Sequence, residues 1–308
     1  MHILNLSGQP EGKVRSWLPK DLQAEKVVFL PDACPGDAPL PTGTATLLSS
    51  ADWRRYAISD VGCGMRFLCS GQGIKVLTKE AWTCLAAKLK ANKGHLGDLG
   101  GGNHFLDALE PYSDDQLCFL IHTGSRSESC LVDELVEYPA RFDAEYERIL
   151  RWARSNRDEI QNVIEDVFGK TEPILDLAHN TFERMADGRV IIRKGAVRAG
   201  PGDLTVIPSS IGGDAVLVEA GEKIGQTLNS LSHGTGRTRA RGESKAIGES
   251  YDLQALRQEV LIPDQIKDSS LKTEGPYAYR DLESCLELLK DYIIVKERFS
   301  VIGYLGHL

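Results

Sequence analysis

Apolar residues recur at two different spacings along the chain, and these spacings predict most of its elements. Within residues 79–91 and 141–168 they fall three or four positions apart, which predicts two helices that each bury one face. Short continuous apolar runs at residues 26–31 and 116–122 predict buried strands. The first half of the chain therefore mixes both kinds of element.

The spacing changes between residues 188 and 221. Three strand-like runs follow one another there, separated by Gly-Pro-Gly and Gly-Gly turns. A further helix is predicted over residues 281–294. Since no internal repeat or low-complexity linker is present, we expect an α+β fold in one domain spanning residues 1–308, with a β-rich core and helices packed outside.

Composition limits the partners and the cellular compartment that we expect for the protein. The 308 residues carry a formal net charge of −8, which argues against bulk affinity for nucleic acid but leaves room for a local basic surface. The N-terminus has no basic stretch followed by a long apolar one, and no uncharged apolar run reaches the length of a membrane span. We therefore expect a cytoplasmic protein without membrane contact.

The cysteines are odd in number and irregular in spacing. Seven occur, and no two of them form a CxxC pair. Without a secretory signal, free thiols in a reducing compartment are the expected state, and a structural zinc knuckle is not expected.

Four of the seven histidines lie among small, turn-forming residues that suit core packing poorly. These are His104, His122, His179 and His233. A lone histidine is more often a hydrogen-bonded structural residue, but four in such contexts favour a shared site.

A carboxylate and a thiol, Asp60 and Cys63, stand three residues apart among glycines that let the backbone turn sharply. With imidazoles they suit Mn²⁺, Fe²⁺, Co²⁺ or Zn²⁺ better than Mg²⁺ or Ca²⁺. The alternative is that Cys63 is a small buried apolar residue and that Asp60 caps a turn. The predicted metal ligands are Asp60, Cys63, His104, His122 and His179.

Two basic groups suit phosphate binding on this acidic chain. They comprise Arg189, Arg193, Lys194 and Arg198, and then Arg237, Arg239, Arg241 and Lys245. The alternative is that both are solvated faces. The segment His233-Gly234-Thr235-Gly236-Arg237 is also suited to present backbone N–H groups to a phosphate.

These motifs, in this order, resemble the RtcB family of RNA-splicing and RNA-repair ligases. The resemblance is carried by Pro31-Asp32-Ala33-Cys34-Pro35-Gly36, Asp60-Val61-Gly62-Cys63, Gly100-Gly101-Gly102-Asn103-His104-Phe105, His122-Thr123-Gly124-Ser125-Arg126, His179-Asn180, Arg193-Lys194-Gly195-Ala196, Pro208-Ser209-Ser210-Ile211-Gly212 and Ser232-His233-Gly234-Thr235-Gly236-Arg237.

The resemblance implies a two-metal site, typically manganese, in which Cys63 bridges the ions. Asp60 and His104 would complete one ion, and His122 and His179 the other. It also implies that His233 takes GMP from GTP and passes it to an RNA 3′-phosphate, which a 5′-hydroxyl end then attacks. A 2′,3′-cyclic phosphate end would be opened first.

The resemblance assigns further roles by position. Asp32 would assist near the nucleotide. The predicted contacts to GTP or GMP are Asn103, Ser210, Gly234, Thr235, Gly236, Tyr279 and His307. The predicted contacts to phosphates of RNA or GTP are Arg126, Arg193, Lys194 and Arg237. Expected partners are GTP, the RNA ends and an activating accessory protein, with the enzyme itself a monomer.

Three positions depart from the family pattern. Cys34 replaces a histidine, Asp107 stands where a glutamate is usual, and His307 lies where the family has a lysine near guanine. The same residues therefore leave other functions open: a guanylyltransferase that caps 3′-phosphate ends without sealing them, a two-metal phosphodiesterase or phosphatase that activates water, and a non-catalytic module that binds RNA ends.

Overall fold

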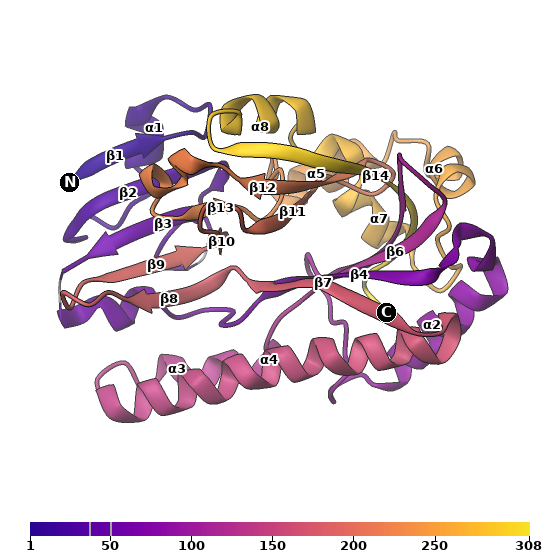
Figure 1. Cartoon of the computed structure of the whole chain (residues 1–308), viewed down its shortest axis with the longest axis horizontal. Coiled ribbons are helices and arrows are strands. Elements are labelled where there is room, and N and C mark those ends of the chain that lie inside the picture. The colour runs from indigo at the N-terminus through magenta and orange to yellow at the C-terminus, as the bar shows by residue number, and fades with distance from the viewer. Residues whose placement is uncertain (37, 50) are drawn as a thin grey trace.

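The computed structural model describes residues 1–36, 38–49 and 51–308, and it has two principal sheets (Figure 1). The smaller sheet has five strands. In spatial order they are β1 (His2–Asn5), β2 (Ala24–Cys34), β3 (Thr42–Leu48), β9 (Val190–Lys194) and β8 (Asn180–Arg184). Its pairings are antiparallel except that between β1 and β2.

The larger sheet has seven strands, all paired antiparallel. In spatial order they are β11 (Leu204–Pro208), β12 (Asp214–Ala220), β14 (Ile293–Leu305), β5 (Phe105–Pro111), β6 (Gln116–Thr123), β4 (Gly64–Gly73) and β7 (Thr171–Ala178). A two-stranded ribbon of β10 (Ala196–Arg198) and β13 (Ser230–Ser232) completes the strands of the described residues.

Helices lie outside these sheets. They are α1 (Glu11–Arg15), α2 (Lys79–Ala91), α3 (Cys130–Asp133), α4 (Pro139–Phe168), α5 (Arg241–Gly248), α6 (Leu253–Glu259), α7 (Asp268–Glu274) and α8 (Leu282–Leu289). The long helix α4 runs along one side of the molecule, beneath β7 and β8 in Figure 1. The α+β fold with a β-rich core is thus confirmed.

The main hydrophobic core lies between the larger sheet and the helices α2 and α4. Trp82 of α2, Phe119 of β6 and Ile160 of α4 are fully buried in it. The helix of residues 79–91 forms as predicted, because Thr78 caps it by accepting from the Ala81 N–H and its apolar face meets the sheet.

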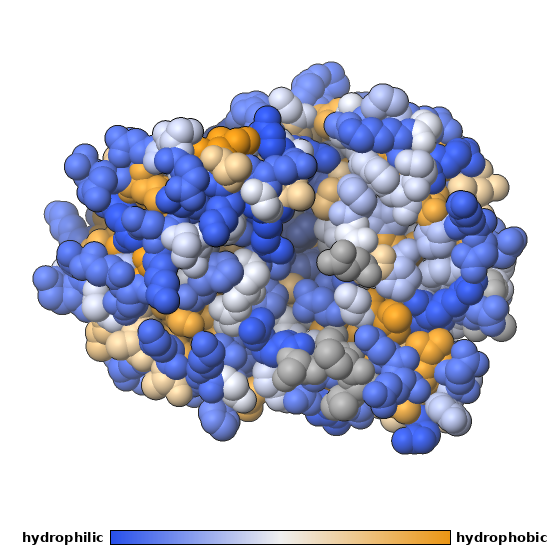
Figure 2. All heavy atoms as spheres, turned by 180° about the vertical axis from the view of Figure 1, so that it is seen from behind, coloured by the Kyte–Doolittle hydropathy of each residue, from blue (hydrophilic) through white to orange (hydrophobic). Residues whose placement is uncertain are grey.

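The opposite face of the molecule from that in Figure 1 is mainly hydrophilic and hollowed near its middle (Figure 2).

The helix predicted over residues 281–294 is wrong at its end. The helix α8 stops at Leu289, and β14 begins at Ile293. Ile293 pairs with Ala220 of β12, and this long-range ladder overrides the helical spacing. The β-branched residues Ile293, Ile294 and Val295 also favour a strand.

The expectation of free thiols is also corrected. Cys69 of β4 and Cys118 of β6 are directly opposite each other, with Cα atoms 4.1 Å apart, and form a disulfide. Cys34, Cys63, Cys84 and Cys285 are free, while the side chain of Cys130 lies outside the described ones. The spacing of the cysteines along the chain did not indicate this disulfide, because the register between β4 and β6 brings the two residues together.

Across the described residues, no helix combines the length and apolar character needed to cross a membrane.

Candidate metal centre and nucleotide site

The ends of three neighbouring strands bring the first group of predicted ligands together. The strand β4 lies between β6 and β7, and its first residue, Gly64, pairs with Thr123 on one side and Ala178 on the other. Cys63, His122 and His179 each adjoin one of these three paired residues. Residues more than fifty positions apart in the sequence therefore meet at one corner of the sheet.

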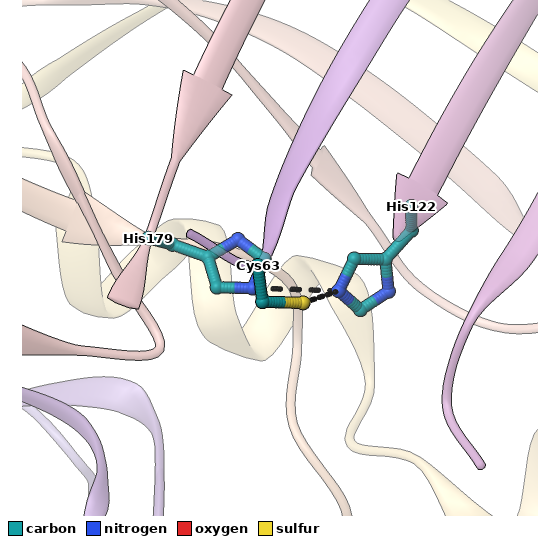
Figure 3. Close-up of side chains that lie close together, drawn as sticks. All are labelled: Cys63, His122 and His179. Atoms are coloured by element: carbon teal, nitrogen blue, oxygen red, sulfur yellow. Dashed lines mark hydrogen bonds between the residues drawn. The ribbon is translucent and has the colours of Figure 1, made fainter. Parts of the chain in front are cut away.

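The ligand atoms of this group point toward one another (Figure 3). The Cys63 Sγ lies 3.3 Å from His122 Nε2, which lies 3.3 Å from His179 Nε2. Donor atoms that share one tetrahedral ion at about 2.0–2.3 Å are about 3.3–3.8 Å apart. The residues present therefore fit a bound transition-metal ion.

A second group shares the same thiol. Asp60, Cys63 and His104 offer ligand atoms that all lie within 4.8 Å of one another. The Cys63 Sγ is 3.4 Å from His104 Nε2. The structure thus brings all five predicted ligands into two groups that have Cys63 in common, which is the arrangement a bridging thiolate requires.

Burial sets the protonation of these groups. It lowers the pKa of His104 to about 4 and holds the pKa values of His122 and His179 well below the ordinary range. These imidazoles are neutral at pH 7, so each has a lone pair for a metal. Burial also raises the pKa of the Cys63 thiol, so the thiolate needs a cation beside it.

His233 lies beside the predicted metal ligands, and one of its ring nitrogens has two partners. Its ring centroid is 4.5 Å from that of His179 and 6.1 Å from that of His122. Its Nδ1 lies 2.6 Å from Asp32 Oδ2 and 2.8 Å from the Gly195 carbonyl oxygen. Both partners are acceptors, so Nδ1 carries a hydrogen, and in the neutral form of the ring Nε2 has the free lone pair.

Asn180 connects the loop of the predicted ligand Asp60 to Gly195, whose carbonyl contacts His233. Its Nδ2 donates to the Asp60 carbonyl at 3.0 Å, and its Oδ1 accepts from the Gly195 N–H at 2.8 Å. The Gly195 carbonyl in turn accepts from His233. Asn180 therefore fixes the Asp60 loop and the His233 ring relative to each other.

Comparison with known proteins identifies the family of this chain. The family model described as tRNA-splicing ligase RtcB matches residues 139–302, which is more than half of the chain. The chain belongs to the RtcB family. The matched part contains His179 and His233, while the other four predicted ligands precede it.

Individual relatives extend the match toward the N-terminus. The RNA-splicing ligase RtcB2 of Escherichia coli is 29% identical over 86% of this chain and 83% of its own length. The RNA-splicing ligase RtcB of Escherichia coli K12 is 26% identical over 66% of this chain and 59% of its own. For the tRNA-splicing ligase RtcB of Nanoarchaeum equitans the values are 26%, 66% and 57%. The match thus spans less than two thirds of the last two proteins.

Three of the residues that the family resemblance assigned to the nucleotide line a cavity beside the predicted metal ligands. Asn103, Ser210 and Tyr279 line it, with Asp107 and Glu274. Asp107 is 5% exposed, and its Oδ1 has no hydrogen-bond partner among the described residues. Tyr279 donates to Glu274, so the two side chains hold each other at the cavity wall.

Sequence reasoning did not assign Glu274 or Asn180 a role. Glu274 lies in the short helix α7, where no local pattern distinguishes it from a solvated acid. Asn180 directly follows His179 within a family motif, and that position was the available signal. In both cases the contacts come from distant segments.

The guanidinium groups of two predicted phosphate contacts already have partners within the protein. Arg193 is 2% exposed, pairs with Glu183 at 2.9 Å and donates to Ser230 Oγ at 2.8 Å. Arg237 pairs with Glu274 at 3.0 Å and donates to the Thr273 carbonyl at 2.7 Å. The exposed Arg198 also pairs with Glu183, at 3.3 Å.

Arg126 and Lys194 lie close to the predicted metal ligands. Arg126 Nη1 is 2.7 Å from His104 Nδ1. The Lys194 ammonium is buried and donates to the carbonyl of Ser59, the residue before Asp60, at 2.8 Å. Each therefore places a positive charge beside the candidate metal centre.

In the loop after His233, one of the backbone N–H groups predicted to face a phosphate has a partner within the protein. The Thr235 N–H donates to the Pro208 carbonyl at 3.1 Å and is not available to a phosphate. Gly236, with φ of +75°, lies directly against the backbone of Asp32. The loop thus positions His233 against Asp32. His307 lies beside Gly101, outside the residues that line the cavity.

Proposed function

We propose that this chain is an RNA ligase that joins 3′-phosphate or 2′,3′-cyclic phosphate ends to 5′-hydroxyl ends, using GTP and Mn²⁺. The observation that carries the proposal is the position of His233. Asp32 holds its Nδ1, and its ring lies beside the two candidate ligands His122 and His179. Family membership and the names of the relatives support the RNA substrate.

In the first step, His233 Nε2 attacks the α-phosphorus of GTP. A nitrogen–phosphorus bond forms, the bond to the β-phosphate oxygen breaks, and pyrophosphate leaves. The ring becomes positively charged as its nitrogen is phosphorylated. The Asp32 carboxylate, which is fully buried 2.6 Å from Nδ1, stabilises that charge and keeps the ring oriented.

In the second step, GMP passes to the RNA 3′-phosphate and His233 is regenerated. A cyclic end must first take up water to give this 3′-phosphate. The 5′-hydroxyl then attacks the activated phosphate, a phosphodiester forms and GMP leaves. Arg126 and Lys194 are the candidates for contacting the RNA phosphates, because both cations lie at the predicted ligands.

The residues that would hold two Mn²⁺ ions are Asp60, Cys63, His104, His122 and His179. When bound, such ions supply positive charge that neutralises phosphate oxygens during attack. The protein contributes neutral, buried imidazoles and a single thiol common to both groups.

We propose that the cavity lined by Asp107, Ser210 and Tyr279 takes the guanine base. The unpaired Oδ1 of Asp107 supports this, because guanine donates from N1–H and its N2 amino group, whereas N1 of adenine is an acceptor. The side chain is shorter than the glutamate usual in the family, so guanine must come closer to β5, which carries Asp107.

One experiment tests the proposal. The protein is incubated with Mn²⁺ and GTP labelled at the α-phosphate, and acid-labile label on the protein is measured. Wild type is expected to take up label, and His233→Ala is not. Absence of label on wild type over a range of metals would remove the basis for both ligation and capping, and would favour a phosphodiesterase or phosphatase.

Labelled RNA then distinguishes the remaining alternatives. Supplied with 3′-phosphate and 5′-hydroxyl ends, the proposed ligase gives a joined product. A capping guanylyltransferase gives only a 3′-guanylylated end, an outcome motivated by the replacements at Cys34, Asp107 and His307.

A further inference from the structure

A buried arginine of the long helix contacts the backbone beside two of the predicted metal ligands. Arg157 of α4 is 3% exposed. Its Nη1 donates at 3.1 Å to the Gly62 carbonyl and at 3.1 Å to the Thr123 carbonyl. Gly62 precedes Cys63 and Thr123 follows His122, so a single nitrogen bridges the two segments that carry these ligands.

The guanidinium is itself fixed in orientation. Its Nε donates at 2.7 Å to Asp176 Oδ1. Asp176 lies in β7, three residues before His179, and its other oxygen accepts from Arg66 at 2.6 Å. Through Asp176, Arg157 is thus tied to the strand that leads to the third ligand of the same group.

The helix also packs directly against the Cys63 loop. A Cβ on Gly62, whose φ is +73°, would lie 3.0 Å from the Ala153 Cβ of α4. In the next turn, the Asn156 side chain accepts from the Gly97 N–H at 2.8 Å and donates to the Asp98 carbonyl at 3.0 Å. One face of α4 therefore holds several loops around the site.

We propose that Arg157 is a positioning residue that sets the spacing of Cys63, His122 and His179 for metal binding. The inference rests on the proposed metal centre. Only a planar guanidinium can bridge two carbonyls from one nitrogen while a second nitrogen meets a carboxylate. An ammonium at the same place is a single point charge and cannot make this set of bonds.

Arg66 offers a matched control within the same ion-pair network. It pairs with Asp176 and also with Asp158, and it donates to Gln161. Among the described residues, its side-chain bonds go to Asp158, Gln161 and Asp176 and not to the Gly62 or Thr123 carbonyl. Arg66→Lys therefore disturbs the buried ion pairs and leaves the bridge between the two ligand segments in place.

The experiment compares Arg157→Lys with Arg66→Lys in the full chain. Metal affinity is measured by calorimetric titration with Mn²⁺ and with Co²⁺, and the Co²⁺-thiolate absorption band reports the bond to Cys63. Thermal unfolding of the metal-free proteins is recorded beside them. We expect Arg157→Lys to lose affinity about 10–100-fold and to weaken the band. Arg66→Lys should keep both at a comparable melting temperature.

The outcomes distinguish failure of the positioning role of Arg157 from failure of the metal centre. Wild-type affinity in Arg157→Lys, or equal losses in both variants, would overturn the positioning role. Failure of wild type to bind either metal would instead overturn the metal centre itself. Should Arg157→Lys not fold, Asp176→Asn loosens the guanidinium without removing its donors. Its metal affinity should fall below that of Arg66→Lys, and an equal affinity would contradict the proposal.

Discussion

The Asp32 carboxylate lies 2.6 Å from Nδ1 of His233, although the two residues are 201 positions apart in the sequence. Asp32 comes from the end of β2, and His233 follows β13. This contact decides which ring nitrogen is free, and it makes the nucleophile of the proposed reaction Nε2.

Asp32→Asn should reduce labelling of the protein by GTP about 10²–10⁴-fold, because an amide no longer fixes the tautomer or stabilises the charged ring. His233→Ala should abolish labelling. The measurement is the rate of acid-labile label incorporation under saturating GTP and Mn²⁺. The exposed His95 provides the control, and His95→Ala should label at the wild-type rate.

Removal of the thiol that both groups share should lower the number of bound metal ions more than removal of a ligand that belongs to one group. Cys63 belongs to both ligand groups, whereas His179 belongs to one. We therefore expect Cys63→Ala to lose both ions and His179→Ala to lose mainly one. Metal content of the purified variants checks this by elemental analysis, and full occupancy in Cys63→Ala would rule out a bridging sulfur.

Asp107 should reduce the stability of the fold at neutral pH. Burial raises the pKa of its carboxyl well above the ordinary value, whereas the unfolded chain ionises it above pH of about 4. Since the unfolded state releases this proton first, the folded state loses stability as pH rises from about 4 toward the raised pKa.

Asp107→Asn removes that loss while keeping the size of the side chain. We expect the variant to be more stable than wild type by about 1 kcal/mol at pH 7 and equal to it near pH 3. Urea unfolding at the two pH values measures the difference. The same variant should bind GTP more weakly if Asp107 contacts the base. A gain in stability that is independent of pH would show that ionisation of Asp107 is not its cause.

Gly236 should be required for the contact between Asp32 and His233. A Cβ there would lie 2.6 Å from the Asp32 Cα, and φ is +75°. Gly236→Ala should cost roughly 1–2 kcal/mol in unfolding free energy from the backbone conformation alone. It should also slow labelling, because the His233 loop must move away from β2.

Gly242 supplies the matched control for that substitution. It lies in α5 without a positive φ, and nothing lies within 4 Å of an added Cβ. Gly242→Ala should leave labelling unchanged and keep or raise the melting temperature. Equal effects of the two substitutions on labelling would show that the close approach to Asp32 is unimportant.

Local patterns determined much of the architecture. The helix of residues 79–91 and the strands at 26–31 and 116–122 follow from hydrophobic spacing, because one face or one short run must be buried. Residue chemistry likewise selected the thiol, carboxylate and imidazoles that the structure brings together. Each of these features is expressed within a few neighbouring residues.

Partnerships between distant segments were decided only by the tertiary structure. The sequence does not reveal that Arg193 pairs with Glu183 and Arg237 with Glu274. Nor does it reveal that Arg157 of α4 donates hydrogen bonds to the two loops that carry Cys63 and His122. An arginine in a helix has the same local pattern whether it meets solvent, phosphate or buried carbonyls. Which of these it meets depends on strand register and helix packing, and these place together residues that are far apart in the chain.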